Sequence, residues 1–352
     1  MKIVKLGFVG FGTVAQGCAK HLVRNRSRLE HELGFQYKVV MIADTVKGSV
    51  RNESRGVDLL KALEVAEKGK KLDSGELRGK PVSSSLEAIR TSDADIIVEA
   101  TWTNLKDAEP GLGHIVTALE NGKDVATSNK GPIALAYKKL TNLAKAKRRQ
   151  LRFEATVMSG TPIFNLRESG LAGAEINSLR GILNGTTNYI LTEMATGGSY
   201  GEALRRAQQM GYAEVDPSGD VDGYDPAAKI TILANALLNV QVQYKDVERI
   251  GITGITNENI KDAARDSKRI KLVASASHNE SGRFNASVKP HLLPDNDILA
   301  HVDGVLNALE ISMDVQPDVT IIGPGAGGDS AGYGLLNDIL SIHKLRAASS
   351  YT

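Results

Sequence analysis

An acidic segment in the second half of the chain carries the residues best suited to chemistry. Five carboxylates fall within residues 214–225, among them Glu214, Asp220 and Asp225. Lys229 follows Asp225 at the i, i+4 spacing that places two side chains on one face of a helix. Carboxylates can hold an ammonium group, and a suitably placed lysine can exchange a proton with a substrate. The D-x-D-x-D-G register and terminal glutamate of a calcium loop are absent, so a solvated acidic loop is the remaining alternative.

A glycine-rich loop near the N-terminus predicts a dinucleotide site. Its sequence, GFGTVA at residues 10–15, fits the G-x-G-x-x-G/A pattern between an expected strand and an expected helix. Glycine lets the backbone turn tightly and approach a pyrophosphate, which the N–H groups of a helix N-terminus attract. An acidic side chain at the end of the next strand can accept hydrogen bonds from the adenosine ribose. The expected contacts are therefore Gly10, Phe11, Gly12, Thr13, Val14 and Asp44.

The same region leaves the choice between NAD and NADP open. Asp44 favours NAD because its charge would repel a 2′-phosphate. Lys47, Arg51 and Arg55 follow closely, however, and could reach such a phosphate. The distance from Gly12 to Asp44 is also longer than the usual spacing of about 20 residues.

A lysine at the end of a later strand is expected beside the same cofactor. The sequence SNKGP at residues 128–132 lies where a parallel strand ends and a helix begins. Ligands of open α/β sheets bind outside the carboxyl ends of the strands. Lys130 is therefore expected to face the cofactor. Cys18, on the helix after the glycine loop, is expected to be buried, which argues against a thiol-based mechanism.

Alternating strands and helices over the first 150 residues are typical of a parallel sheet covered on both faces. The expected strands are 3–10, 37–44, 94–101, 124–128 and 151–157, and the expected helices are 14–33, 114–121 and 133–149. Residues 47–80 are interpreted as an exposed helix and loop.

After residue 158 the pattern changes to that of a mixed α+β domain. The expected helices are 189–195, 201–210 and 226–239, with Asp225 as the N-cap of the third, and the expected strands are 272–277, 286–289 and 307–313. An apolar strand at 319–323 and a helix at 333–343 repeat the strand-and-helix pattern of the first 150 residues, which indicates that the chain returns to complete that domain. We therefore expect a Rossmann-type α/β domain, a doubly wound parallel sheet formed by residues 1–150 and 322–352. Residues 151–321 are expected to form a second α+β domain, which contains the acidic segment and Lys229.

The composition favours a small-molecule partner. The 43 lysines and arginines nearly balance the 41 acidic residues of the 352-residue chain. Nucleic-acid binding needs clustered excess positive charge, so we expect no nucleic-acid partner. No stretch approaches the roughly 20 apolar residues of a membrane span. With a single cysteine no internal disulfide can form, and we expect a soluble protein of the reducing cytoplasm.

Several motifs together resemble homoserine dehydrogenase. They occur in the family's order from residue 7 to about residue 332. The segments 181–190 and 211–229 are the most specific, whereas the glycine loop alone is not. The motifs are GFVGFGTVA, EAT (99–101), SNKGP, EATVMSGTPI (154–163), GILNGTTNYI (181–190), GYAEVDPSGDVDGYDPAAK (211–229) and GPGAG (323–327).

The resemblance implies reversible oxidation of L-homoserine to L-aspartate 4-semialdehyde with NAD or NADP, in threonine and methionine synthesis. It also implies a homodimer formed through strands of the second domain. Lys229 resembles the catalytic acid/base, helped by Lys130, and a monovalent cation such as Na⁺ is implied near residue 154. The implied cofactor residues are Gly12, Thr13, Val14, Thr101, Lys130 and Gly327, the substrate residues Glu214, Asp225 and Asp220, and the cation ligands Glu154, Val157, Ser159 and Thr161.

The chain also departs from the family's pattern. Ser330 stands where the family more often has threonine, and only about twenty residues follow it. We therefore expect no C-terminal ACT regulatory domain and no inhibition by threonine of that type. Two other readings compete with this one. Sugar or inositol dehydrogenases of the glucose–fructose oxidoreductase type commonly use Asp-x-x-x-His, where this chain has Asp225 and Lys229. A non-enzymatic nucleotide sensor would need neither the carboxylates nor the lysines.

Overall fold

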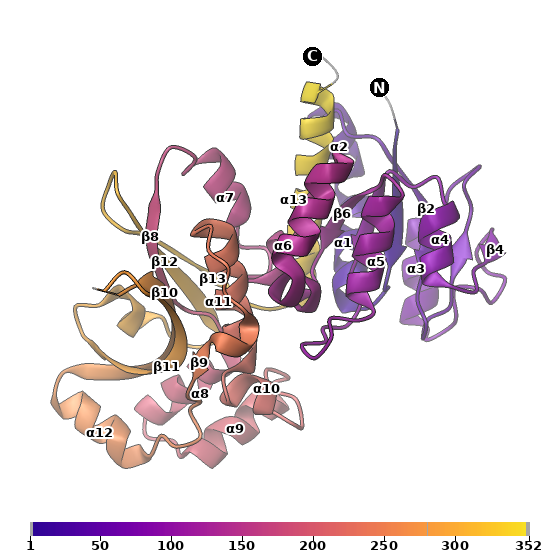
Figure 1. Cartoon of the computed structure of the whole chain (residues 1–352). Coiled ribbons are helices and arrows are strands. Elements are labelled where there is room, and N and C mark those ends of the chain that lie inside the picture. The colour runs from indigo at the N-terminus through magenta and orange to yellow at the C-terminus, as the bar shows by residue number, and fades with distance from the viewer. Residues whose placement is uncertain (1–2, 280, 350–352) are drawn as a thin grey trace. The chain divides into compact units, whose positions relative to one another are not determined.

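The computed structural model describes residues 3–279 and 281–349, which form two units (Figure 1). The first comprises residues 1–162 and 327–352, and the second comprises residues 163–326. These divisions differ from the expected ones at 150/151 and 321/322. The first lies later because the turn at 154–156 packs against the last helix, within the first unit. The second lies later because strand 319–324 belongs to the second unit's sheet.

A seven-stranded sheet forms the centre of the first unit, in the order β4-β3-β2-β1-β5-β6-β7. Its middle strand β1 runs parallel to β2 on one side and to β5 on the other. The apolar side chains of β1 and β5 are buried, which requires cover on both faces. The strands are β1 (Val4–Val9), β2 (Tyr37–Ala43), β3 (Val50–Arg51), β4 (Lys80–Pro81), β5 (Ile96–Glu99), β6 (Asp124–Thr127) and β7 (Leu151–Arg152).

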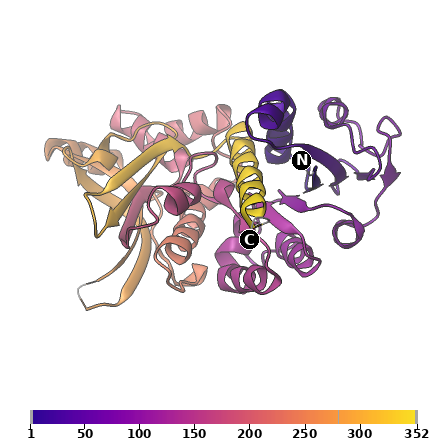
Figure 2. The same cartoon turned by 90° about the horizontal axis from the view of Figure 1, so that it is seen from above.

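Helices cover this sheet on both faces, as expected for a doubly wound α/β fold (Figure 2). On one face α1 packs against α3 and α13, and on the other α5 packs against α4 and α6. The helices are α1 (Thr13–Arg24), α2 (Arg26–His31), α3 (Leu59–Glu67), α4 (Ser85–Thr91), α5 (Gly111–Glu120), α6 (Lys130–Lys147) and α13 (Gly328–Ser349).

Three expected elements of the first unit were wrong in detail. The helix expected at 14–33 is two helices, interrupted at Asn25, whose side-chain amide donates to the His21 carbonyl. The strand expected at 151–157 ends at Arg152 and is followed by a 3₁₀ turn, η1 (Glu154–Thr156). Residues 47–80 are more than an exposed helix and loop. They add the antiparallel strand β3 and the edge strand β4 to the sheet, and α3 buries an apolar face in the core.

The last helix completes the first unit. Helix α13 buries Leu335, Ile339 and Ile342 in the same core as α1. The two helices approach so closely that a Cβ placed on Gly332 would lie 2.3 Å from the backbone nitrogen of Cys18. Cys18 itself is fully buried, and burial raises the pKa of its thiol. This thiol is therefore part of the packing rather than a reactive group.

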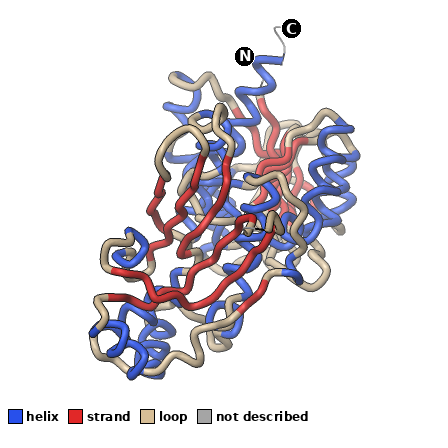
Figure 3. The backbone as a smooth tube through the Cα atoms, turned by 60° about the vertical axis from the view of Figure 1, so that its left-hand side comes forward, coloured by secondary structure: helices blue, strands red, loops and turns tan. Residues whose placement is uncertain are grey.

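The second unit is built on a six-stranded sheet in the order β13-β12-β8-β10-β11-β9 (Figure 3). Helix α11 packs against β8, β10 and β11, while α8 packs against β10 and β12. The strands are β8 (Ile176–Ile182), β9 (Glu248–Arg249), β10 (Lys268–His278), β11 (Phe284–Pro294), β12 (Leu306–Met313) and β13 (Val319–Pro324). The helices are α7 (Phe164–Ser169), α8 (Gly185–Ala195), α9 (Tyr200–Gln209), α10 (Ser218–Val221), α11 (Tyr224–Leu237) and α12 (Asn257–Arg265), with 3₁₀ turns η2 (Tyr244–Asp246) and η3 (Ile298–His301).

Two features of this unit differ from the sequence-based expectation. The strand β8 was not expected, although it pairs with both β10 and β12 near the centre of the sheet. The helix expected to begin at Pro226 begins at Tyr224, because Gly223 adopts a left-handed conformation and serves as the N-cap. Asp225 therefore lies in the first turn of α11 rather than at its cap. Across both units, none of the helices in the described ranges is long and apolar enough to cross a membrane.

Candidate active site

The glycine loop connects β1 to α1 and is held by an acidic side chain. Gly10 has a φ of +80°, and a Cβ there would lie 2.6 Å from the Ala100 carbonyl oxygen, so only glycine fits. The backbone N–H of Phe11 donates to Oδ2 of Asp44 at 2.6 Å, while Oδ1 accepts from the N–H groups of Val46 and Lys47. The phenyl ring of Phe11 is fully buried in the core. Phe11 therefore offers a ligand little beyond its backbone.

The residues that begin α1 leave room for an anionic group. Gly12 is the N-cap of α1, and no other group lies within 4 Å of the position that its Cβ would take. The N–H groups of a first helical turn lack intrahelical partners and attract phosphate. Gly327, with a φ of +115°, precedes Gly328, whose Cβ would lie 2.3 Å from Cγ2 of Thr13. The end of GPGAG thus lies against the start of α1, and the cradle fits a dinucleotide pyrophosphate.

Thr101 and Lys130 follow two adjacent parallel strands, β5 and β6. Thr101 lies two residues beyond the end of β5, and Lys130 is the first residue of α6. Asn129 caps α6 through a hydrogen bond from the Gly131 N–H, and its Nδ2 donates to Oγ1 of Thr101 at 3.2 Å. The helix begins three residues earlier than expected, which places Lys130 in its first turn at the carboxyl edge of the sheet.

Lys229 lies on α11 and is only 6% exposed. Its Nζ is 2.8 Å from Oδ2 of Asp225, so the expected i, i+4 pair is present. The same Nζ donates to the Leu183 carbonyl at 2.7 Å, directly beyond the end of β8. A buried lysine amine is thus held between a carboxylate and a carbonyl.

Asn184 joins two of the candidate carboxylates and was missed as a site residue. Its Nδ2 donates to Oδ1 of Asp220 at 2.6 Å and to Oδ2 of Asp225 at 3.0 Å. Its Oδ1 accepts the N–H of Thr187 and so caps α8. Burial and the neighbouring Asp225 carboxylate raise the pKa of Asp220. The GILNGTTNYI motif was the only sequence signal for Asn184, because its partners lie some forty residues away.

Glu214 is placed differently from the other candidates. It lies in the exposed loop that follows α9, and Gln208 donates to its backbone carbonyl. Within the described ranges its carboxylate makes no ion pair with Lys229 or any other cation. The loop leaves this carboxylate accessible to a ligand.

The four expected cation ligands lie in one buried segment of the first unit. Glu154, Val157, Ser159 and Thr161 are all at most 8% exposed. Ser159 has a φ of +58°, and its hydroxyl donates to the Gly327 carbonyl at 3.3 Å. Carboxylate and carbonyl oxygens are the donors that hard cations prefer. No group of three or more His, Cys, Asp or Glu side chains suited to a metal occurs among residues 3–279 and 281–349.

Comparison with known proteins places both units in one family. The family profile of the homoserine dehydrogenase NAD-binding domain matches residues 10–154, and that of homoserine dehydrogenase matches residues 162–340. The chain belongs to the homoserine dehydrogenase family. It is therefore an oxidoreductase with an NAD-binding domain. An NAD(+)-dependent homoserine dehydrogenase of Pseudomonas canavaninivorans is 41% identical over 342 residues, which cover 97% of this chain and 96% of that relative.

Other family members agree in sequence and in fold. The homoserine dehydrogenase of Methanocaldococcus jannaschii is 40% identical over 95% of this chain and 97% of its own length. The crystal structure of a homoserine dehydrogenase from Thiobacillus denitrificans matches with a TM-score of 0.85 and 31% identity, covering 99% of this chain and 75% of that one. A hyperthermophilic archaeal homoserine dehydrogenase mutant in complex with NADPH matches with a TM-score of 0.83 and 31% identity over 98% of both chains.

Replacing the buried carboxyl at position 220 tests its electrostatic environment. Because the pKa of Asp220 is raised in the folded state, the protonated form is favoured there. Wild-type stability then falls as pH rises from the ordinary pKa of about 4 through the raised value. The amide of Asp220→Asn can still accept the Asn184 bond but cannot ionise. We expect the melting temperature of Asp220→Asn, relative to wild type, to increase between pH 4.5 and pH 7. An unchanged difference across that range would contradict the assignment.

Proposed function

We propose that the chain interconverts L-homoserine and L-aspartate 4-semialdehyde, with NAD as its preferred cofactor, in the synthesis of threonine and methionine. The observation that carries this proposal is the buried Lys229–Asp225 pair at the end of β8, joined by Asn184 to Asp220. Family membership supplies the reaction class, and this cluster supplies groups suited to a zwitterionic amino alcohol.

In this proposal the acidic groups bind and Lys229 exchanges the proton. Glu214, Asp225 and Asp220 hold the ammonium group of homoserine through charge-assisted hydrogen bonds. A bound nicotinamide cofactor would supply the acceptor for the hydride that leaves C4. In this step Nζ of Lys229 acts as the neutral amine: it takes the hydroxyl proton and becomes an ammonium, and C4 is left as the carbonyl of the semialdehyde. Lys130, at the start of α6, is proposed to assist, as the family resemblance implies.

Substitution of Lys229 tests the acid/base assignment. We expect Lys229→Ala and Lys229→Met to lower kcat for homoserine oxidation by about a thousandfold, as loss of a general base predicts. Because the glycine loop belongs to the other unit, NADH binding should be nearly unchanged. Formation of NADH or NADPH at 340 nm measures turnover, and fluorescence titration measures binding.

A matched control separates chemistry from the loss of any buried lysine. Lys271 of β10 is 2% exposed and paired with Asp303, and burial lowers its pKa. We expect Lys271→Met to lower the melting temperature while kcat stays close to wild type. Wild-type-like kcat in Lys229→Met, or equal losses in the Lys229 and Lys271 variants, would contradict the assignment. No turnover of homoserine by the wild-type enzyme would contradict the proposed function itself.

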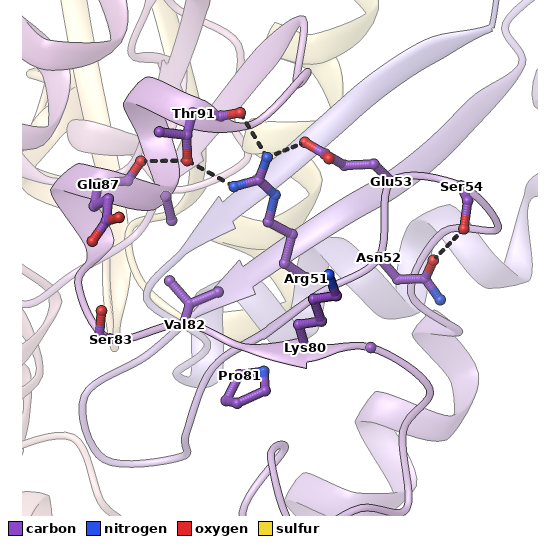
Figure 4. Close-up of a pocket in the computed structure, with 12 residues that line it drawn as sticks. Arg51, Asn52, Glu53, Ser54, Lys80, Pro81, Val82, Ser83, Glu87 and Thr91 are labelled. Carbon is purple, nitrogen blue, oxygen red and sulfur yellow. Dashed lines mark hydrogen bonds and ion pairs between the residues drawn. The ribbon is translucent and has the colours of Figure 1, made fainter.

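The preference for NAD is argued from the surroundings of Asp44. Its carboxylate is fixed beside the glycine loop by three backbone N–H groups, so its charge stands where a 2′-phosphate would approach. Arg51, expected as a competing phosphate ligand, is turned elsewhere. Its guanidinium binds the hydroxyl and carbonyl of Thr91 and the carboxylate of Glu53 (Figure 4). In the sheet, Arg51 of β3 is paired with Met41 of β2, and Met41 lies three residues before Asp44.

The ratio of NAD to NADP use tests this preference. We expect Asp44→Ala to shift the ratio of kcat/KM values about tenfold toward NADP, as removal of one repulsive charge predicts. Arg51→Gln serves as the control and should leave the ratio unchanged. The opposite pattern, a selective loss of NADP use in Arg51→Gln with no effect in Asp44→Ala, would show that the arginine reads the cofactor instead.

We also propose that the chain forms a homodimer through the sheet of its second unit, as the family resemblance implies. Ser275, Arg180 and Glu310 are paired across β10, β8 and β12, and all three are partly exposed, whereas Ala274 and Leu309 on the opposite face are buried. This partly exposed row is the surface that we propose for contact with a second copy. Sedimentation equilibrium should give twice the chain mass of 37.6 kDa. A monomer at micromolar concentration would contradict the proposal.

We also propose a monovalent cation site in the buried segment that begins at Glu154. The carboxyl of Glu154 and the carbonyls of Val157, Ser159 and Thr161 are its proposed ligands. Their shared burial in one short segment supports it, because buried oxygen atoms of this kind suit Na⁺.

A further inference from the structure

A buried carboxylate that no part of the proposed reaction uses lies at the carboxyl edge of the first sheet. Glu99, the last residue of β5, is completely buried. Burying a carboxylate requires that its oxygens accept several hydrogen bonds. Oε1 accepts both the N–H and the hydroxyl of Thr101, and Oε2 accepts the hydroxyl of Thr127 at 2.8 Å. Thr101 lies on the loop that follows β5, and Thr127 is the last residue of β6.

Asn129 closes these contacts into a ring. Its backbone N–H donates to Oγ1 of Thr127 at 3.0 Å, and its side-chain Nδ2 donates to Oγ1 of Thr101 at 3.2 Å. Glu99, Thr127, Asn129 and Thr101 thus form one closed circuit of hydrogen bonds. Asn129 is also the N-cap of α6, whose first residue is Lys130. The circuit therefore fixes both the Thr101 loop and the start of α6.

The Glu99 carboxylate can only accept hydrogen bonds, and this fixes which group donates in every hydrogen bond of the ring. Each threonine hydroxyl donates to Glu99 and uses a lone pair to accept from Asn129. A glutamine at position 99 would present an NH₂ group to one of them. A hydroxyl that already accepts from Asn129 would then lose the acceptor for its own proton. An ionised carboxylate accepts all three donors at once.

A histidine lies near the ring without joining it. Nδ1 of His114 lies 3.6 Å from Oε1 of Glu99, and Nε2 is 2.8 Å from Oγ of Ser85. The first separation is too long for a hydrogen bond, so His114 is not one of the donors to Glu99. The carboxylate therefore depends on the two threonines for its hydrogen bonds.

We propose that Glu99 is a positioning residue that holds Thr101 and, through Thr127 and Asn129, the Lys130 turn in the geometry that binds the nicotinamide cofactor. This rests on the proposed function only in assigning those two loops to the cofactor. In this proposal Glu99 contacts neither substrate nor cofactor, because it is completely buried. Its effect reaches them through the loops that it fixes.

The test compares cofactor binding with stability. We expect Glu99→Gln to raise the Kd for NADH about tenfold, because charge-assisted hydrogen bonds are lost, while KM for homoserine changes little. Thr127→Val should have the same effect, since it removes one hydroxyl of the ring. Thr127→Ser keeps that hydroxyl and should bind NADH as tightly as the wild type does. NADH fluorescence titration, well below the melting temperature, provides the readout.

A neighbouring core substitution controls for destabilisation. Ile97 of β5 is fully buried, and Ile97→Val removes one methylene group without touching the ring. We expect it to lower the melting temperature but to leave the Kd for NADH unchanged. Wild-type Kd values in Glu99→Gln and Thr127→Val, or an equal rise of the Kd in Ile97→Val, would overturn the proposal. NADH binding does not require homoserine turnover, so this outcome is separate from a failure of the wild-type enzyme to oxidise homoserine.

Discussion

The arrangement of the second unit depends on one constraint, the placement of a lysine amine in the protein interior. Lys229 is almost wholly removed from solvent, and an unpaired charge there would be strongly destabilising. Asp225 and the Leu183 carbonyl satisfy the amine, which ties α11 to the end of β8. Asn184, the next residue after Leu183, then links Asp225 to Asp220 and caps α8. The helices α8, α10 and α11 and the strand β8 are thus oriented around a single amine.

The first unit uses its acidic residues in a different way. Asp44 and Glu99 both lie at the ends of parallel strands, where ligand-binding carboxylates are usually sought. Here the oxygens of both accept backbone or hydroxyl donors from adjacent loops. Each carboxylate shapes a loop, and the loops in turn shape the cofactor edge. Asp44 also contributes its charge to that edge, whereas Glu99 is completely buried.

Local features of the fold and site could be predicted from the sequence, and long-range ones could not. The Asp225–Lys229 pair follows from i, i+4 spacing alone, and the β1–glycine loop–α1 unit follows from its motif. Asn184 and Arg51 find partners some forty residues away, and nothing in the spacing specifies these. β8 lacked a clear strand pattern because polar Asn177, Ser178 and Arg180 interrupt its apolar residues. α11 starts early because Gly223 adopts a left-handed conformation and caps it. The sequence predicted a later start because Pro226 is itself a favourable first residue of a helix.

The position of α13 has a consequence for how the chain is made. The cofactor unit is interrupted after residue 162 and completed only from residue 327 onward. Its core lacks Leu335, Ile339 and Ile342 until those residues have been synthesised. During translation the uninterrupted second unit can therefore fold while the first still exposes the apolar groove that α13 will fill. The N-terminal part of this enzyme is then the last to become a finished domain, and its contacts with α13 are among the longest loop closures in the chain.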